Sequence, residues 1–387
     1  MQILKLPDAG KRVYGLDILR AVAILVVVFG HGKRLLEQHF DVSWMSHLIL
    51  DGVTIFFVLS GFLIGQILIR NFEQQGATTK TLAQFWMRRW FRTLPNYFLI
   101  LFMLLGIFHF VLGVDYERET EFFFFFQNFA WDHPYYFMEA WSLSVEEWFY
   151  LTTPILLFVI NRLGFGVKNS FLIVAVIIIL FSTGVRFYRD AREIVTNFTQ
   201  LDDSIRKQVV TRLDSLMYGI VAAWLCHYYS EIFIRYRIHF LIAGLILSIG
   251  YKLSFMLIRT VTPGIFFYIT VFSFSVFSSA VMFLLPFFYS IKIGKGWVYR
   301  ILTNTSRVSY SMYLIHHSLI LLLLIPLIKD HLTIPGDEIK SLIVYFLYWA
   351  TTILGSVLLF KYWELPMMNL RDKIPIIPFR KVRNLIR

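Results

Sequence analysis

Long apolar runs recur along the whole chain and are separated by shorter polar segments. About ten of them are long enough to cross a bilayer as helices, since a span needs roughly 20 apolar residues. The expected spans lie near residues 14–34, 46–69, 94–113, 142–161, 170–187, 213–230, 237–254, 265–289, 309–328 and 341–363. The pattern therefore predicts an all-α, polytopic membrane protein. We expect residues 1–387 to form one integral membrane domain, with 1–13 and 364–387 as cytoplasmic ends.

Composition agrees with this class. The 387 residues are 57% hydrophobic with a mean hydropathy of +0.64, which is more apolar surface than a soluble protein of this length can bury. The single cysteine excludes an intrachain disulfide and a cysteine-rich metal site. The first apolar run carries Arg20 and is followed by His-Gly-Lys-Arg, so we expect a retained helix rather than a cleaved signal peptide.

The charges predict an orientation. With the N-terminus inside the cell, about 23 of the 37 Lys and Arg residues fall in inside segments. Most acidic residues then fall outside, and the opposite orientation would place the basic tail outside. We therefore expect both termini in the cytoplasm. Basic cytoplasmic loops also explain the net charge of +12, so no nucleic-acid partner is expected.

The first span contains a notable pair of ionisable residues, Arg20 and His31. Eleven residues separate them, which places both on nearly one helix face, about 16 Å apart along the axis. Ionisable groups at membrane depth are costly and by default mark a function. Arginine suits phosphate or carboxylate, and histidine exchanges protons near neutral pH. The helix thus offers an anion anchor and a candidate general base.

The segment before the third expected span is basic. Arg88 and Arg92 are four residues apart and share a helix face, and Pro95 is expected to begin the span. The simpler interpretation is a juxtamembrane segment that fixes orientation, and the functional one is a clamp for a phosphorylated ligand. In the second span, Ser60-Gly61 indicates close helix packing more than a polar contact.

Two carboxylates, Glu146 and Glu147, are expected to begin the fourth span on the outer side. One could cap the helix, and a carboxylate near His31 could orient the imidazole. Adjacent residues point about 100° apart, so at most one fits a given cavity well.

Further polar residues stand at or in later spans. Arg212 and Asp214 are two residues apart and do not meet on a helix, so each is expected to have another partner. Both are also candidate residues of a substrate channel. In the ninth span, His316 follows Tyr310 and Tyr313; it is either a packing residue or part of a channel lining. Adjacent histidines are poor chelators on a helix, and metal dependence is not expected.

Seven segments in order along the chain resemble those of the acyltransferase 3 family of integral membrane O-acyltransferases. They are Arg20-x10-His31, FFVLSGFLIG (56–65), RRWFRTLP (88–95), WSLSVEEWFYL (141–151), RLDSLMYG (212–219), SYSMYLIH (309–316) and WELP (363–366). Thr54 stands where many relatives carry Asp, Trp148 replaces a frequent Gln, and no esterase-like domain follows the tenth span. We therefore expect a stand-alone multi-pass enzyme of the bacterial cytoplasmic membrane.

The resemblance implies transfer of an acyl group, commonly acetyl, from cytoplasmic acyl-CoA to a hydroxyl, commonly on an extracytoplasmic glycan or lipid-linked sugar. His31 would be the base, and acyl-CoA a co-substrate rather than a permanently bound cofactor. The arginines that would hold CoA are Arg20, Arg88, Arg89 and Arg92. Candidate oxyanion donors are Trp141, Ser142 and Tyr313.

Three alternatives stay open at this point. The acceptor could instead be a lipid or a secreted small molecule. A covalent acyl-histidine could replace direct transfer. A secondary transporter would also have about ten spans with buried charges, although paired halves and broken helices are not evident. A homo-oligomer is neither predicted nor excluded.

Overall fold

The computed structural model describes residues 6, 12–48, 50–115, 117–257, 263–333 and 335–371. All regular elements in this part of the chain are helical, which confirms the predicted all-α class. The long helices are α1 (Tyr14–Gly32), α3 (Gly52–Gln75), α4 (Thr79–Gly106), α5 (Ala140–Ile160), α6 (Gly166–Ala191), α8 (Val209–Tyr228), α10 (Arg237–Leu257), α12 (Ser273–Ser290), α13 (Gly296–Ile315) and α15 (Asp337–Leu359).

Shorter elements connect or extend these helices. The α-helical ones are α2 (Ser43–Leu48), α7 (Phe198–Leu201), α9 (Ser230–Arg235), α11 (Pro263–Val271), α14 (Ile325–His331) and α16 (Leu365–Arg371). The 3₁₀ turns are η1 (Lys33–Leu35) and η3 (Glu119–Phe124). The π-helical turns are η2 (Ile107–Val111), η4 (Asn161–Phe165), η5 (Asp202–Arg206), η7 (His316–Leu324) and η8 (Phe360–Glu364).

Within the described residues, nine helical runs are long and apolar enough to cross a membrane. One of them, residues 140–191, is too long for a single span at about 20 residues each. It divides at Gly164, which has a φ of 94°, into α5 and α6, and these two helices pack against each other. The described helices are those of a multi-pass membrane protein. The expected span 265–289 divides between α11 and α12, and the expected span 46–69 begins in α2 and continues in α3. Most of the basic tail expected at 364–387 lies outside the described residues.

Two helices start earlier than the spans expected from hydropathy. Pro95 lies inside α4, which starts at Thr79, where Thr78 caps the first turn. The segment with Arg88 and Arg92 is therefore part of a continuous helix and not a separate surface segment. Likewise α13 starts at Gly296, well before the predicted position 309. In both cases polar residues extend the N-terminal end of the helix beyond the point where hydropathy alone predicts its start.

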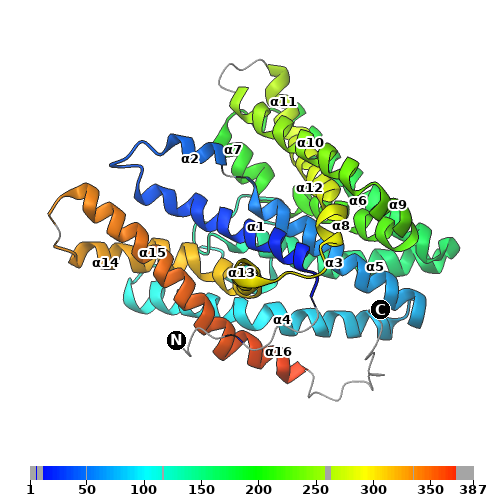
Figure 1. The fold of residues 1–387 in the computed structure, drawn as a ribbon, viewed down its shortest axis with the longest axis horizontal. Helices are drawn as coiled ribbons and strands as arrows, with labels where there is room; N and C mark the ends of the chain where they lie inside the picture. The colour runs from blue at the N-terminus through cyan, green and yellow to red at the C-terminus, as the bar shows by residue number, and fades with distance from the viewer. Residues whose placement is uncertain are drawn as a thin grey trace.

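The first helix lies in the middle of the bundle. Figure 1 shows α1 in blue, and it packs against α3, α12 and α13. The green helices α6, α8 and α10 gather on one side of the bundle, whereas α4, α15 and α16 run along the other. The central position of α1 explains why its polar residues can contact several other helices at once.

Glycines allow a close contact between α3 and α8. A Cβ atom at Gly61 of α3 would overlap the carbonyl oxygen of Leu216 in α8, and one at Gly219 would overlap that of Val58. The two backbones can approach this closely only because neither residue has a side chain. The predicted packing role of Ser60-Gly61 is confirmed for Gly61.

Candidate active site

A cavity of about 100 Å³ lies between α1, α3, α4, α5 and α13. Its apolar wall comes mostly from α3, and its polar wall mostly from the other four helices. The polar lining consists of Arg20, Ser60, Arg89, Arg92, Thr93, Ser142, Glu146, Tyr150, Ser309, Tyr310 and Tyr313. Five of the seven segments that carry the family resemblance thus contribute to one cavity.

Three arginines converge on this cavity. Arg20 enters from α1, and Arg89 and Arg92 from consecutive turns of α4. The neighbouring Arg88 is not a lining residue. Glu146 is the one carboxylate of the lining, so the lining carries more positive than negative charge. Such a site suits a phosphorylated or carboxylated ligand.

The two adjacent carboxylates of α5 have different surroundings. Glu146 accepts a hydrogen bond of 3.0 Å from the Tyr150 hydroxyl, which in turn lies 2.9 Å from that of Ser60. Glu147 is buried outside the cavity lining and accepts a 2.7 Å hydrogen bond from Thr93. Because α5 begins at Ala140, neither residue caps the helix. The alternative in which one of them caps the helix is therefore wrong.

His31 lies at the end of α1 and has a different partner from the expected one. Its Nδ1 lies 2.8 Å from Nε2 of His316, and its ring stacks on that of His317 at 4.3 Å. His316 is fully buried, and its Nδ1 donates a 2.7 Å hydrogen bond to the carbonyl of Tyr313. A histidine, rather than Glu146 or Glu147, thus contacts the imidazole of His31.

Tyr313 connects the cavity with the histidines. Its hydroxyl lies 2.7 Å from that of Ser142, and both residues line the cavity. Its ring centroid is 5.6 Å from that of His316. His31 is not a lining residue of this cavity. His316 lies between it and Tyr313.

The sequence interpretation missed Glu139. Its carboxylate accepts hydrogen bonds from the backbone N–H and the hydroxyl of Ser318, and it lies 4.0 Å from Nδ1 of His317. Burial is the main cause that raises the pKa of Glu139 to about 7. Glu139 precedes Glu146 by seven residues, which is two helical turns, and this spacing could have indicated that both face inward.

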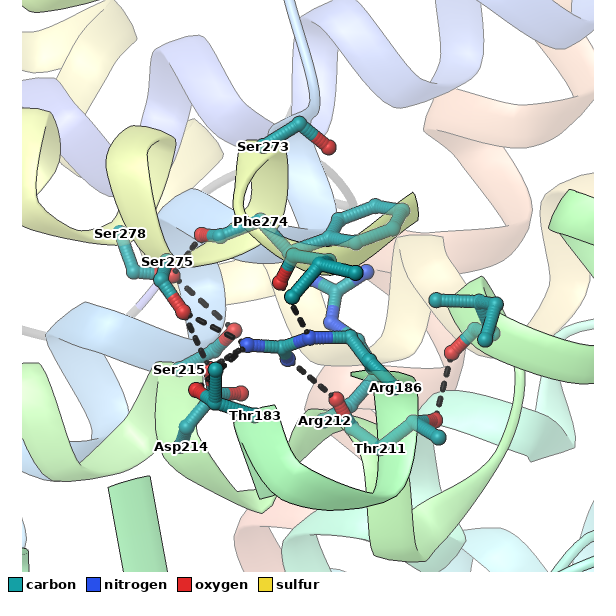
Figure 2. Close-up of polar contacts among 12 residues, drawn as sticks. Thr183, Arg186, Thr211, Arg212, Asp214, Ser215, Ser273, Phe274, Ser275 and Ser278 are labelled. Carbon is teal, nitrogen blue, oxygen red and sulfur yellow. Dashed lines mark hydrogen bonds and ion pairs between the residues drawn. The ribbon is translucent and has the colours of Figure 1, made fainter. Parts of the chain in front are cut away.

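Arg212 and Asp214, which were candidate residues of a substrate channel, do not line the cavity. Figure 2 shows Asp214 paired with Arg186, at 2.8 Å and with both side chains fully buried. Arg212 donates to Thr54, lies 3.8 Å from the carboxylate of Asp51, and stacks on Phe274 at 4.2 Å. Each has a separate partner, as predicted, and together they attach α8 to α3, α6 and α12.

Two further expectations concern Trp141 and the position of Thr54. Trp141 packs edge-on against Phe57 and under the guanidinium of Arg206, outside the cavity lining. Asp51 supplies the carboxylate that the resemblance would place at position 54, since it accepts a 2.7 Å hydrogen bond from the Thr54 hydroxyl. An acidic group is therefore present near Arg212, contributed from one helical turn earlier.

The described residues contain no group of three or more His, Cys, Asp or Glu side chains arranged to hold a metal ion. The ring of His31 is nearly parallel to those of His316 and His317, at interplanar angles of 15° and 26°.

Comparison with known proteins agrees with the resemblance. The chain is 30% identical over 185 residues to a peptidoglycan O-acetyltransferase, OatA, of Listeria monocytogenes, which covers 43% of this chain and 27% of that protein. It is 29% identical over 228 residues to the O-acetyltransferase OatA of Staphylococcus aureus, which covers 54% of this chain and 34% of that protein. The chain thus spans about a third or less of the length of these curated relatives. No solved structure matches it.

The family described as "Acyltransferase domain" matches residues 13–361. This range includes α1 to α15 and every residue of the cavity lining. The chain therefore belongs to the acyltransferase 3 family of membrane acyltransferases.

Proposed function

We propose that the protein transfers an acyl group, most simply acetyl, from cytoplasmic acyl-CoA to a hydroxyl of an extracytoplasmic glycan or lipid-linked sugar. The observation that supports this most is the cavity. It joins three arginines from α1 and α4 to the Ser142–Tyr313 pair, next to the histidines. The names of the two relatives support the reaction class.

The arginines are the proposed binding site for the donor. Arg20, Arg89 and Arg92 would contact phosphate or the polar part of the pantetheine arm through charge-assisted hydrogen bonds. The thioester would then lie toward Tyr313, since the axial distance from Arg20 to His31 is about 16 Å. Because the cavity ends at Tyr313, the Ser142 and Tyr313 hydroxyls would separate to admit the thioester.

His31 is the proposed general base. The acceptor O–H bond breaks as its proton moves to Nε2 of His31, and the oxygen bonds to the thioester carbonyl carbon. The negative charge on the carbonyl oxygen is stabilised by hydrogen bonds from Ser142 and Tyr313. The C–S bond then breaks, and the CoA thiolate takes the proton from His31. The products are the acyl ester and free CoA.

The test is acyl transfer by purified protein. Radiolabelled acetyl-CoA would be incubated with soluble peptidoglycan fragments, the acceptor class that the name of the Listeria relative indicates. In parallel, cell-surface glycans would be compared by mass spectrometry with and without the gene. We expect a mass difference of one acyl group, and we expect His31→Ala to abolish transfer by the purified protein.

The matched control is His109→Ala, because His109 is exposed and lies in η2 away from the cavity. It should keep wild-type transfer. Wild-type transfer by His31→Ala would overturn the base assignment. Unchanged glycans together with no consumption of acetyl-CoA would overturn the proposed reaction.

A further inference from the structure

The hydrogen bonds around His316 determine which nitrogen of His31 carries a proton. A backbone carbonyl can only accept, so Nδ1 of His316 must be the protonated nitrogen in its 2.7 Å contact with Tyr313. A neutral imidazole has one protonated nitrogen. Nε2 of His316 therefore has a free lone pair that can accept a hydrogen bond. The partner of this atom is Nδ1 of His31.

The proton in the contact between the two histidines must then belong to His31. Its Nδ1 donates across the 2.8 Å distance to Nε2 of His316. This leaves Nε2 of His31 unprotonated, which is the form that can remove a proton from a hydroxyl. Histidine in water prefers the opposite tautomer, with the proton on Nε2, so His316 is needed to hold the reactive form.

The surroundings keep His316 in place. It is fully buried, and it is the first residue of η7, where the α-helical pattern of α13 changes to a π-helical turn. Such turns are rare and often occur at functional sites. Two residues later, Ser318 binds Glu139 through its backbone N–H and its hydroxyl. This contact attaches η7 to the start of α5.

We propose that His316 is a positioning residue that selects the Nδ1–H tautomer of His31 through the relay from His31 to His316 to the Tyr313 carbonyl. The inference rests on the proposed role of His31 as a base. The general precedent for such a relay is the carboxylate that orients the histidine in serine hydrolases, where loss of the correct tautomer costs about 10⁴-fold in kcat.

Three variants separate the parts of this proposal. His316→Phe keeps a ring of similar shape but removes the acceptor. His316→Gln supplies an amide oxygen that accepts from His31 and an N–H that can donate to Tyr313. His317→Phe is the matched control, since His317 stacks on His31 and no hydrogen bond joins the two rings in the structure.

The direct measurement is ¹⁵N NMR of protein labelled on the histidine rings and placed in lipid nanodiscs. The His31 resonances are identified by their absence in His31→Gln. We expect wild type and His316→Gln to show Nδ1 protonated and Nε2 unprotonated, and His316→Phe to lose this preference. The same Nδ1–H tautomer in His316→Phe, or an Nε2–H tautomer in wild type, would overturn the proposal.

Kinetics with acetyl-CoA give a second readout. His316→Phe should lower kcat by about 10²–10⁴-fold with KM for acetyl-CoA changed less than about twofold. His316→Gln should recover most of kcat, and His317→Phe should lose less than about threefold. Equal losses in the Phe and Gln variants, both still folded by thermal unfolding, would contradict the relay.

The two proposals fail differently. An inactive His31→Ala with a fully active His316→Phe removes the relay and leaves the base assignment. An active His31→Ala removes the base assignment, while the NMR measurement still decides the tautomer.

Discussion

The hydroxyl groups of Ser142 on α5 and Tyr313 on α13 lie 2.7 Å apart where the arginine-lined cavity ends beside the histidines. Both side chains are buried, and Ser142 also lies 3.3 Å from the carbonyl of Glu139. The Tyr313 hydroxyl also donates to the carbonyl of Glu139, at 3.3 Å. Two helices that are distant in sequence therefore meet through hydrogen bonds of Tyr313, between the proposed donor site and His31. This position gives Tyr313 a specific role to test.

Tyr313→Phe removes the hydroxyl and keeps the ring. If the hydroxyl stabilises the thioester oxyanion, kcat should fall by about 10²–10³-fold, the usual effect of losing one such donor. KM for acetyl-CoA should stay within about twofold, because the arginines are unchanged. Steady-state kinetics of acetyl transfer measure both values. An unchanged kcat would exclude the oxyanion role.

Adjacent arginines on α4 offer a matched pair for the donor site. Arg89 lines the cavity and Arg88 does not. Arg89→Ala should raise KM for acetyl-CoA by about 10-fold or more, since a hydrogen bond to a charged group contributes about 1.5–3 kcal/mol. Arg88→Ala should change it clearly less. The measurement is initial rate against acetyl-CoA concentration, and equal effects of the two variants would contradict the assignment.

Glu139 predicts a pH dependence of stability. Its carboxyl has a pKa of about 7 in the folded protein, against an ordinary value of 4.5. The folded state therefore binds this proton more tightly than the unfolded state. Its contribution to stability is fully present below pH 4.5 and is lost as the pH rises toward and through 7.

Thermal unfolding in detergent measures this effect. Between pH 4.5 and 7 the midpoint of wild type should fall relative to that of Glu139→Gln, whose side chain does not titrate. Parallel curves for the two proteins would show that Glu139 is not held protonated.

The contact between α3 and α8 predicts a large effect of one methyl group. Gly61→Ala places a Cβ against the carbonyl oxygen of Leu216, and backbone atoms cannot move aside as a flexible side chain can. We expect destabilisation of about 1–3 kcal/mol or more from overpacking. Gly250→Ala in α10 is the control, because no atom outside its own helix turn lies within 4 Å of the position that its new methyl group would take.

The two alanine variants should differ in sign. Gly250→Ala should be neutral or stabilising, by up to about 1 kcal/mol, because alanine favours helix interiors over glycine. Thermal unfolding in the same detergent compares them. A Gly61→Ala protein as stable as Gly250→Ala would mean that the two helices do not pack as closely as described.

The amino-acid sequence alone predicts the class of protein and names most of the polar residues that line the cavity. Apolar runs of about 20 residues predict spanning helices, because the bilayer imposes the same local requirement on each. Arg20 and His31 could be paired from one helix alone, since the 3.6-residue repeat places residues eleven apart on one face. Arg89, Arg92, Ser142, Glu146, Tyr310 and Tyr313 were also found from sequence, through the family resemblance or from their own helices.

Which helices meet, and at which face, follows only from their packing in three dimensions. The contacts of His316 with His31, of Glu139 with Ser318, and of Asp51 with Thr54 and Arg212 fall outside what hydropathy specifies. Arg88 and Arg89 look alike in sequence and differ in whether they line the cavity. The physical reason is that periodicity defines faces within one helix, whereas its rotation and depth against neighbours depend on side-chain packing, such as the contact at Gly61.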